Sequence, residues 1–153
     1  MKKIRIGIAG YGNLGKGVEM AIRQNEDMEL AGVFTRRDPA TVTVKTPGAK
    51  VIHHGRCKEY EGSDRCYDHL WRSATDLPKQ TPELAKDFNV IDSFDTHANI
   101  PQHFANVDAA AKENGHLAMI SVGWDPGLFS LNRIYAESIL PKRKNLYSSG
   151  VKA

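Results

Sequence analysis

Three glycines near the start of the chain have the spacing that a dinucleotide phosphate requires. The stretch GYGNLG at 10–15 fits the pattern G-x-G-x-x-G and follows an apolar run, IRIGIA at 4–9. In this pattern Gly10 permits a tight turn, Gly12 lets the backbone approach a pyrophosphate, and Gly15 lets the next helix pack closely. The N–H groups and the positive dipole end of that helix would face the phosphates. We therefore predict dinucleotide binding; the alternative is a glycine turn that serves packing alone.

Two arginines follow the second apolar run, MELAGVF at 28–34, at the place where NAD-binding proteins usually carry an acidic residue. Thr35, Arg36 and Arg37 stand there instead. A carboxylate at this position would repel a 2′-phosphate, whereas a guanidinium binds it through charge-assisted hydrogen bonds. The sequence therefore predicts NADP(H) over NAD(H) as the cofactor. The alternative is that the arginines belong to a solvated loop end.

Carboxylates also gather after two later apolar segments. Asp92 and Asp95 lie in IDSFDTH, and Asp125 follows Trp124 in SVGWDPG. Because ligands bind outside the carboxyl ends of parallel strands, these carboxylates suit a cationic group such as an ammonium, with the indole as a flat wall. The alternative for Asp125 is a cap at the start of the next helix. His97 is a candidate general base, or else a loop histidine that only bonds locally.

The elements that must position these residues alternate along the chain. Short, β-rich and largely apolar runs predict buried strands, and apolar residues at helical spacing predict helices. Such alternation is typical of an α/β fold with a doubly wound parallel sheet, covered by helices on both faces. The expected strands are 4–9, 28–34, 89–94 and 116–123, and the expected helices are 14–25, 79–88, 100–115 and 128–140.

The composition limits the class of protein. The chain has 153 residues, 41% of them apolar, and a net charge of +3, which fits one soluble domain with a real core. No dense Lys/Arg stripe indicates nucleic acid, and no run is long enough to span a membrane. The run at the N-terminus is broken by Arg5 and lacks a cleavage site, so we expect a cytoplasmic protein. The spacing of Cys57 and Cys66 predicts no metal site.

Five stretches together resemble one family, the meso-diaminopimelate D-dehydrogenases. They are IRIGIAGYGNLGKGVE, VFTRR, SATDLPKQTPELA, DSFDTHANIP and SVGWDPGLFSLNRIYAESILP, within residues 1–47 and 73–141. The resemblance is to the N-terminal, cofactor-binding part and implies a Rossmann-like domain over 1–141. It also implies a homodimer that acts in lysine and diaminopimelate biosynthesis. The implied reaction is NADP-dependent oxidative deamination of meso-2,6-diaminopimelate at its D-centre, yielding L-2-amino-6-oxopimelate and ammonia.

The resemblance assigns roles to particular residues. Asp95, Trp124 and Asp125 would approach the amino group at the reacting carbon, as substrate-binding and catalytic groups. With the glycine pattern, the resemblance also gives a cofactor-binding set drawn from the phosphate turn, the end of the second strand and three later loops. This set is Gly10, Tyr11, Gly12, Asn13, Leu14, Gly15, Thr35, Arg36, Arg37, Ser73, Ala74, Ser93, Phe94, Asp95, Val122, Gly123, Trp124, Asp125 and Pro126.

The chain departs from the family before SATD, where the family has an apolar strand and a Cys-Gly-Gly-like turn. Residues 67–72 read YDHLWR instead. Read one nucleotide forward with suitable codons, these positions give Met-Ile-Ile-Cys-Gly-Gly. One hypothesis is a pair of compensating frame shifts; the rival is a genuine insertion. Because unpaired buried charge is costly, we expect the polar segment 53–72 to loop out of a weakened sheet.

A second departure lies at the end of the chain. The family continues past YAESILP into a substrate and dimerisation domain, whereas residues 142–153 read KRKNLYSSGVKA without an apolar pattern. We expect these residues to form an unstructured tail. The leading hypothesis is a dehydrogenase fragment without activity of its own. One alternative is a stand-alone NADP(H)-binding module. The other is a different NADP-linked enzyme, of the dihydrodipicolinate reductase or homoserine dehydrogenase type, and the stretch GWDPG argues against any such enzyme.

Overall fold

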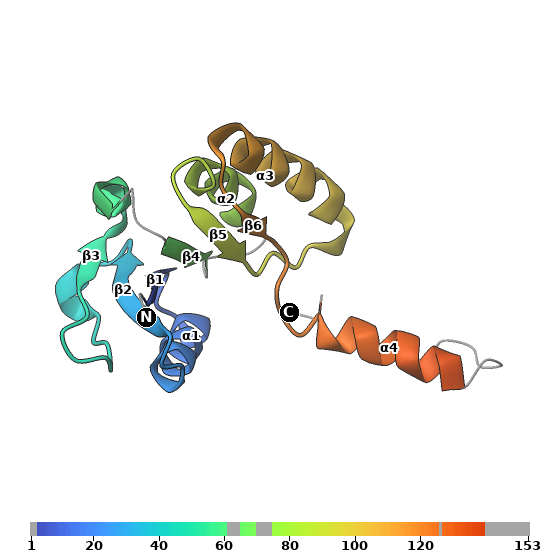
Figure 1. The fold of residues 1–153 in the computed structure, drawn as a ribbon, viewed down its shortest axis with the longest axis horizontal. Helices are drawn as coiled ribbons and strands as arrows, with labels where there is room; N and C mark the ends of the chain where they lie inside the picture. Colours follow the sequence, from blue (N-terminus) through green and yellow to red (C-terminus); the bar gives the residue numbers. More distant parts are fainter. Residues whose placement is uncertain (1–2, 61–64, 70–74, 126, 140–153) are drawn as a thin grey trace.

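The computed structural model describes residues 3–60, 65–69, 75–125 and 127–139, with the backbone alone at 58, 60 and 65–69. The strands of this part form one parallel sheet in the order β3-β2-β1-β4-β5-β6 (Figure 1). The order reverses between β1 and β4, which is the doubly wound arrangement that the sequence predicts. The strands are β1 (Ile4–Ala9), β2 (Met28–Thr35), β3 (Val51–His53), β4 (Arg65–His69), β5 (Asn89–Asp92) and β6 (Ala118–Met119).

Helices cover the sheet on opposite faces. In Figure 1, α1 lies below the sheet, α2 and α3 lie above it, and α4 extends away from it. This follows from right-handed crossovers that run outward from the centre in two directions. The helices are α1 (Asn13–Gln24), α2 (Leu77–Leu84), α3 (Ile100–Asn114) and α4 (Leu128–Ile139), with 3-10 turns η1 (Pro39–Thr41), η2 (His54–Tyr60) and η3 (His97–Asn99).

The core is divided by the sheet into two apolar clusters. Successive side chains of a strand point to opposite faces, so neighbouring residues fall into different clusters. Ile8 and Val33 pack with α1, while Ala9 and Phe34 pack on the other face with α2 and α3. Strands that are buried on both faces explain the continuous apolar runs at β1 and β2.

The bounds of most elements agree with the sequence prediction. Two strands are shorter than expected, and α2 covers Leu77–Leu84 rather than 79–88. β5 stops at Asp92, because its carboxylate accepts the backbone N–H of Phe94 and so turns the chain. β6 covers Ala118–Met119, and the chain leaves the extended conformation at Ser121, whose φ is 59°. α3 ends at Gly115, which has the left-handed φ of 72° that suits a helix C-terminus.

The expectation that residues 53–72 loop out is wrong in part. Residues 54–60 form η2, and the backbone of β4 pairs along β1 on one side and β5 on the other. Backbone hydrogen bonds do not depend on the side chain, and without β4 the facing edges of β1 and β5 would lack partners. The central strand therefore forms from residues without an apolar pattern. Residues 61–64 and 70–74 lie outside the described part.

None of the described helices is long and apolar enough to cross a membrane.

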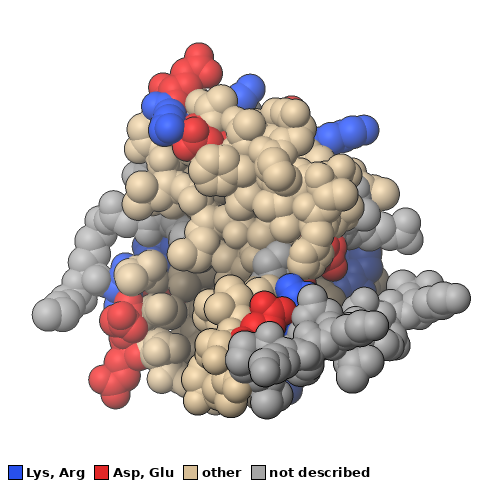
Figure 2. Space-filling view, turned by 90° about the vertical axis from the view of Figure 1, so that its right-hand side faces the viewer, with Lys and Arg blue, Asp and Glu red and all other residues tan. Residues whose placement is uncertain are grey.

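The surface carries large apolar side chains at α4. Figure 2 shows the side that lies on the right in Figure 1, where uncharged side chains cover a broad area and charged ones lie mainly at its margins. The exposed apolar side chains of α4 are Leu128, Leu131, Ile134, Tyr135 and Ile139.

Candidate functional site

The three glycines of the turn after β1 meet different requirements. Gly10 has a φ of 98°, which only glycine adopts without strain. A Cβ atom at Gly15 would lie 2.4 Å from the Gly10 carbonyl oxygen, so α1 can approach β1 this closely only with glycine there. A Cβ atom at Gly12 would meet no described atom within 4 Å. Folding therefore explains Gly10 and Gly15, whereas Gly12 faces open space where a ligand can approach.

A pocket of about 460 Å³ opens at this turn. It lies at the N-terminus of α1, where backbone N–H groups and the helix dipole favour an anion. Lys16 is the one lining residue that the sequence analysis did not single out; its place on the first turn of α1 was the available signal. The lining residues are Gly10, Tyr11, Gly12, Asn13, Lys16, Thr35, Arg36 and Arg37.

The two arginines after β2 are held differently. Arg37 Nη2 donates to the carbonyl oxygen of Tyr11 at 2.9 Å, and the Arg37 backbone N–H donates to Thr35 Oγ1 at 3.1 Å. Arg36 Nη2 lies 2.8 Å from Asp76 Oδ2, and 52% of the Arg36 side chain is exposed. Arg37 is therefore fixed to the glycine turn, while Arg36 is turned toward the start of α2. Both cations border the pocket at the glycine turn.

A buried carboxylate that the sequence analysis missed lies behind this turn. Glu19 of α1 is fully buried and accepts hydrogen bonds from the Tyr11 hydroxyl and from the backbone N–H groups of Lys45 (2.8 Å) and Thr46 (2.6 Å). Burial alone would raise the pKa of Glu19, but these donors outweigh it and lower that pKa. Burial and then Glu19 raise the pKa of Tyr11 to about 12. Glu19 thus stays ionised and ties the turn to residues 45–46.

The loops after β5 and β6 lie next to each other. His97 Nε2, in the first loop, is 3.8 Å from Asp125 Oδ1 in the second. Ser130 Oγ donates to the same Asp125 oxygen at 3.1 Å, and Arg133 Nη2 lies 3.8 Å from it. Trp124 is 62% exposed. A cationic group that docks on Asp125 would therefore meet Arg133 as a competing cation, a residue that the sequence analysis did not single out.

The alternative reading of Asp125 as a helix cap does not match its contacts. α4 begins at Leu128, and the Asp125 carboxylate accepts a hydrogen bond from the Ser130 hydroxyl. The backbone N–H groups of Phe129 and Leu131 donate instead to the carbonyl oxygens of Trp124 and Gly127. The Asp125 carboxylate therefore lies beside the first turn of the helix and borders the loop surface.

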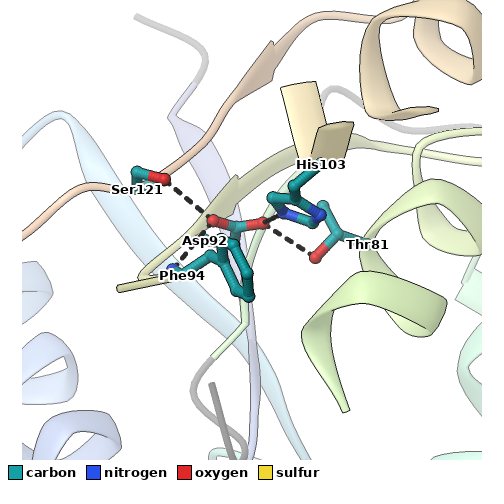
Figure 3. Close-up of polar contacts among 5 residues, drawn as sticks. All are labelled: Thr81, Asp92, Phe94, His103 and Ser121. Atoms are coloured by element: carbon teal, nitrogen blue, oxygen red, sulfur yellow. Dashed lines mark hydrogen bonds and ion pairs between the residues drawn. The ribbon is translucent and has the colours of Figure 1, made fainter. Parts of the chain in front are cut away.

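Asp92 does not have the role proposed from the sequence. Its side chain is fully buried and accepts four hydrogen bonds, so it is not available to a cationic substrate (Figure 3). Burial would raise its pKa, but hydrogen bonds, that from His103 first, lower it. The donors are Thr81 Oγ1 (2.8 Å), His103 Nε2 (2.6 Å), Phe94 N (3.1 Å) and Ser121 N (2.9 Å).

The remaining predicted cofactor residues are in part exposed, in part buried, and in part outside the described residues. Asn13 and Leu14 are exposed on the first turn of α1, and Val122 and Gly123 are exposed after β6. Ser93 and Asp95 follow β5, whereas the Phe94 side chain is buried against the His103 ring, with 4.4 Å between ring centroids. The predictions for Ser73, Ala74, Pro126 and the tail 142–153 fall outside the described residues.

Comparison with known proteins finds similar curated proteins and similar solved structures, although no family model matches the chain. The meso-diaminopimelate D-dehydrogenase of Ureibacillus thermosphaericus is 60% identical over 141 residues, which are 92% of this chain and 43% of that protein. The chain therefore spans less than half the length of the curated relatives that it matches.

Two solved structures agree with this relative. A mutant meso-diaminopimelate dehydrogenase of Clostridium tetani with bound diaminopimelate has a TM-score of 0.79 and 54% identity, over 93% of this chain and 43% of that one. An engineered D-amino acid dehydrogenase bound to NADP+ has a TM-score of 0.79 and 39% identity, over 90% and 42%. In sequence and in fold, the chain is therefore a relative of the meso-diaminopimelate D-dehydrogenases and corresponds to their N-terminal part.

Proposed function

We propose that the chain binds NADP(H) across the carboxyl end of its sheet. The observation that carries the proposal is the pocket that joins the glycine turn to Arg36 and Arg37. Gly12 leaves room for a pyrophosphate against the N-terminus of α1, and the guanidinium groups suit a 2′-phosphate. The relative that is bound to NADP+ at 39% identity supports the same cofactor.

The nicotinamide half would lie beyond the reversal of the strand order, over the loops after β5 and β6. These loops carry Asp95, Trp124 and Asp125, the residues proposed to meet the substrate. The contact between His97 and Asp125 supports their forming one surface. The proposed cofactor contacts from Ser93 to Asp95 and from Val122 to Pro126 belong to the same surface.

For a protein of the relatives' length, the proposed reaction is the oxidative deamination of meso-2,6-diaminopimelate at its D-centre. NADP+ held in this pocket would supply the two-electron acceptor: the carbon that bears the amino group would lose its hydrogen as a hydride, and the nitrogen would lose a proton to give an iminium group. Water would then hydrolyse that group to the oxo product and release ammonia. The carboxylates of Asp95 and Asp125 would accept hydrogen bonds from the ammonium group, and the Trp124 indole would lie beside it. Such contacts hold the reacting carbon against the cofactor, and positioning is the main contribution that the protein makes to hydride transfer.

The identities of 60% and 54% to meso-diaminopimelate dehydrogenases favour this reaction over that of another NADP-linked reductase. The chain covers 43% of the length of such relatives. We therefore propose that the 153-residue chain alone binds cofactor but does not turn over substrate, and that dimerisation and most substrate contacts belong to the longer protein.

Calorimetric titration of the chain with NADP+, NAD+ and 2′,5′-ADP tests cofactor binding. We expect NADP+ and 2′,5′-ADP to bind and NAD+ to bind at least about tenfold more weakly, because charge-assisted hydrogen bonds to the 2′-phosphate are worth about 1.5–3 kcal/mol each. Absence of 2′,5′-ADP binding would refute the proposal.

A pair of variants separates the specific contact from net charge. Arg37→Leu removes the cation that is fixed to Tyr11 and should weaken NADP+ binding about ten- to a hundredfold while changing NAD+ binding little. Arg23→Leu is the matched control, since Arg23 is exposed at the end of α1, away from the pocket. Equal losses in both variants would show that only overall charge matters.

A further inference from the structure

The side chain of Asp92 joins four elements of the fold at one point. Thr81 belongs to α2 and His103 to α3, and both donate to Asp92 Oδ2. Phe94 follows β5 and Ser121 follows β6, and their backbone N–H groups donate to Asp92 Oδ1 (Figure 3). One oxygen thus faces the helices, and the other faces the two loops.

The side that faces the helices is rigid. Asp92 and His103 are almost wholly buried, and the Phe94 ring closes over the imidazole. An ionised carboxylate only accepts hydrogen bonds, so His103 Nε2 must carry the proton in this contact. His103 and Thr81 therefore help to fix the plane of the carboxylate that the two loops contact.

The side that faces the loops holds an unusual backbone. Ser121 has a φ of 59°, a left-handed conformation that costs a side-chain-bearing residue free energy. Its N–H donates to Asp92 Oδ1, and the N–H of Val122 donates to the Asp92 carbonyl oxygen at 2.8 Å. One residue at the end of β5 thus binds two successive N–H groups of the loop after β6 and stabilises its turn.

We propose that Asp92 is a positioning residue for the nicotinamide half of the site: by holding Ser121 left-handed, it sets the direction in which residues 122–125 leave the sheet. This inference rests on the proposed NADP(H) function. Trp124 and Asp125 lie on this segment, so its direction decides where both side chains stand. Asp92 itself touches neither cofactor nor substrate, because it is fully buried.

A matched pair at Ser121 tests the proposal without disturbing the buried network. Ser121→Val keeps the N–H group but strongly disfavours a positive φ, whereas Ser121→Gly adopts it freely. Ser121 Oγ has no hydrogen-bond partner among the described residues, so replacing Ser121 with glycine breaks no side-chain hydrogen bond within that part of the chain. Asp92→Ala removes the acceptor itself, and Asp92→Asn restores an oxygen toward the loops.

The readout is the ratio of affinities for NADP+ and 2′,5′-ADP, which share the adenosine half only. We expect Ser121→Val and Asp92→Ala to weaken NADP+ binding about tenfold and 2′,5′-ADP binding less than about twofold, with Ser121→Gly unchanged and Asp92→Asn in between. Equal loss for both ligands, or an unchanged ratio in Ser121→Val, would overturn the proposal.

A ligand-free measurement separates this inference from the proposed function. Amide hydrogen exchange at Val122–Asp125 should be about tenfold faster in Ser121→Val than in Ser121→Gly, with β1 unaffected. Failure of the parent chain to bind 2′,5′-ADP refutes the proposed cofactor but leaves this comparison intact. Equal exchange in the two variants overturns the positioning role, even if Asp92→Ala does not fold.

Discussion

Glu19 has an environment that differs sharply from what its type suggests. A glutamate on a helix usually faces solvent, yet Glu19 is fully buried between the glycine turn and residues 45–46. The sequence held a signal for this, since Glu19 lies four residues after Gly15 and three before Ile22, on the buried face of α1. Spacing thus predicts the face, but only the fold shows which donors satisfy the carboxylate.

Replacing Glu19 with glutamine should destabilise the chain by about 1–3 kcal/mol at neutral pH, because a charged acceptor of buried donors is lost. The pKa of Glu19 is lowered from its ordinary value of 4.5 in the folded state, so its stabilisation is present above that value and is lost as pH falls through the lower, folded pKa. Urea unfolding at neutral and acidic pH measures the difference.

The control for Glu19→Gln is Glu26→Gln at an exposed position, which should change the free energy of unfolding by less than about 0.5 kcal/mol. A gap between the Glu19 variant and the parent that stays constant as the pH falls would contradict the role of the ionised carboxylate.

At the scale of the element, the contact between α1 and β1 makes three glycine substitutions distinguishable. Gly15→Ala places a Cβ atom 2.4 Å from a carbonyl oxygen and should cost about 1–3 kcal/mol of stability. Gly17→Ala, with no described atom within 4 Å of its Cβ, should stabilise α1 by about 0.5–1 kcal/mol. Gly12→Ala should fold like the parent but bind NADP+ more weakly.

Thermal unfolding and NADP+ titration of these three variants check the prediction together. If Gly17→Ala bound NADP+ weakly, or if Gly12→Ala bound it as well as the parent, the open space at Gly12 would not be where the cofactor binds.

The central strand β4 gives a second prediction at this scale. Its backbone pairs with β1 and β5 at Cys66–His69, so amide exchange there should be slow, like that of the paired residues of β1. Hydrogen exchange followed by mass spectrometry measures both segments in one experiment. Exchange at 66–69 as fast as in an open loop would restore the expectation that this segment loops out.

These elements show where sequence-based prediction succeeds and where it fails. β1, α1, β2 and α3 carry apolar periodicity and glycine or proline signals, and their predicted ends lie within about two residues, as is usual. β4 has no such pattern. Its position in the sheet comes from pairing with β1 and β5, so the sequence of β4 alone does not predict it. The glycine turn and the two arginines could be predicted from their residue types and their places directly after strands. The places of Lys16 and Arg133 and the burial of Asp92 depend on tertiary contacts, which the sequence does not show.

At the scale of the whole molecule, α4 is the feature that most affects behaviour in solution. Its apolar side chains are exposed, and an exposed apolar helix face promotes association. We predict that the isolated chain self-associates at micromolar concentration and that Leu131→Gln combined with Ile134→Gln reduces this. Light scattering coupled to size exclusion measures the masses; a parent chain that stays monomeric at high concentration contradicts the prediction.

The hydrogen bonds that Glu19 accepts also have a consequence for the order of folding. Its side chain sits in α1, yet two of its donors lie beyond β2, at Lys45 and Thr46. A nascent β1-α1-β2 unit therefore keeps this carboxylate hydrated until the following chain segment folds over it. We therefore predict that residues 45–46 dock late in folding, after the rate-limiting barrier. Glu19→Gln should accordingly speed unfolding more than it slows refolding, because its native contacts are absent from the transition state.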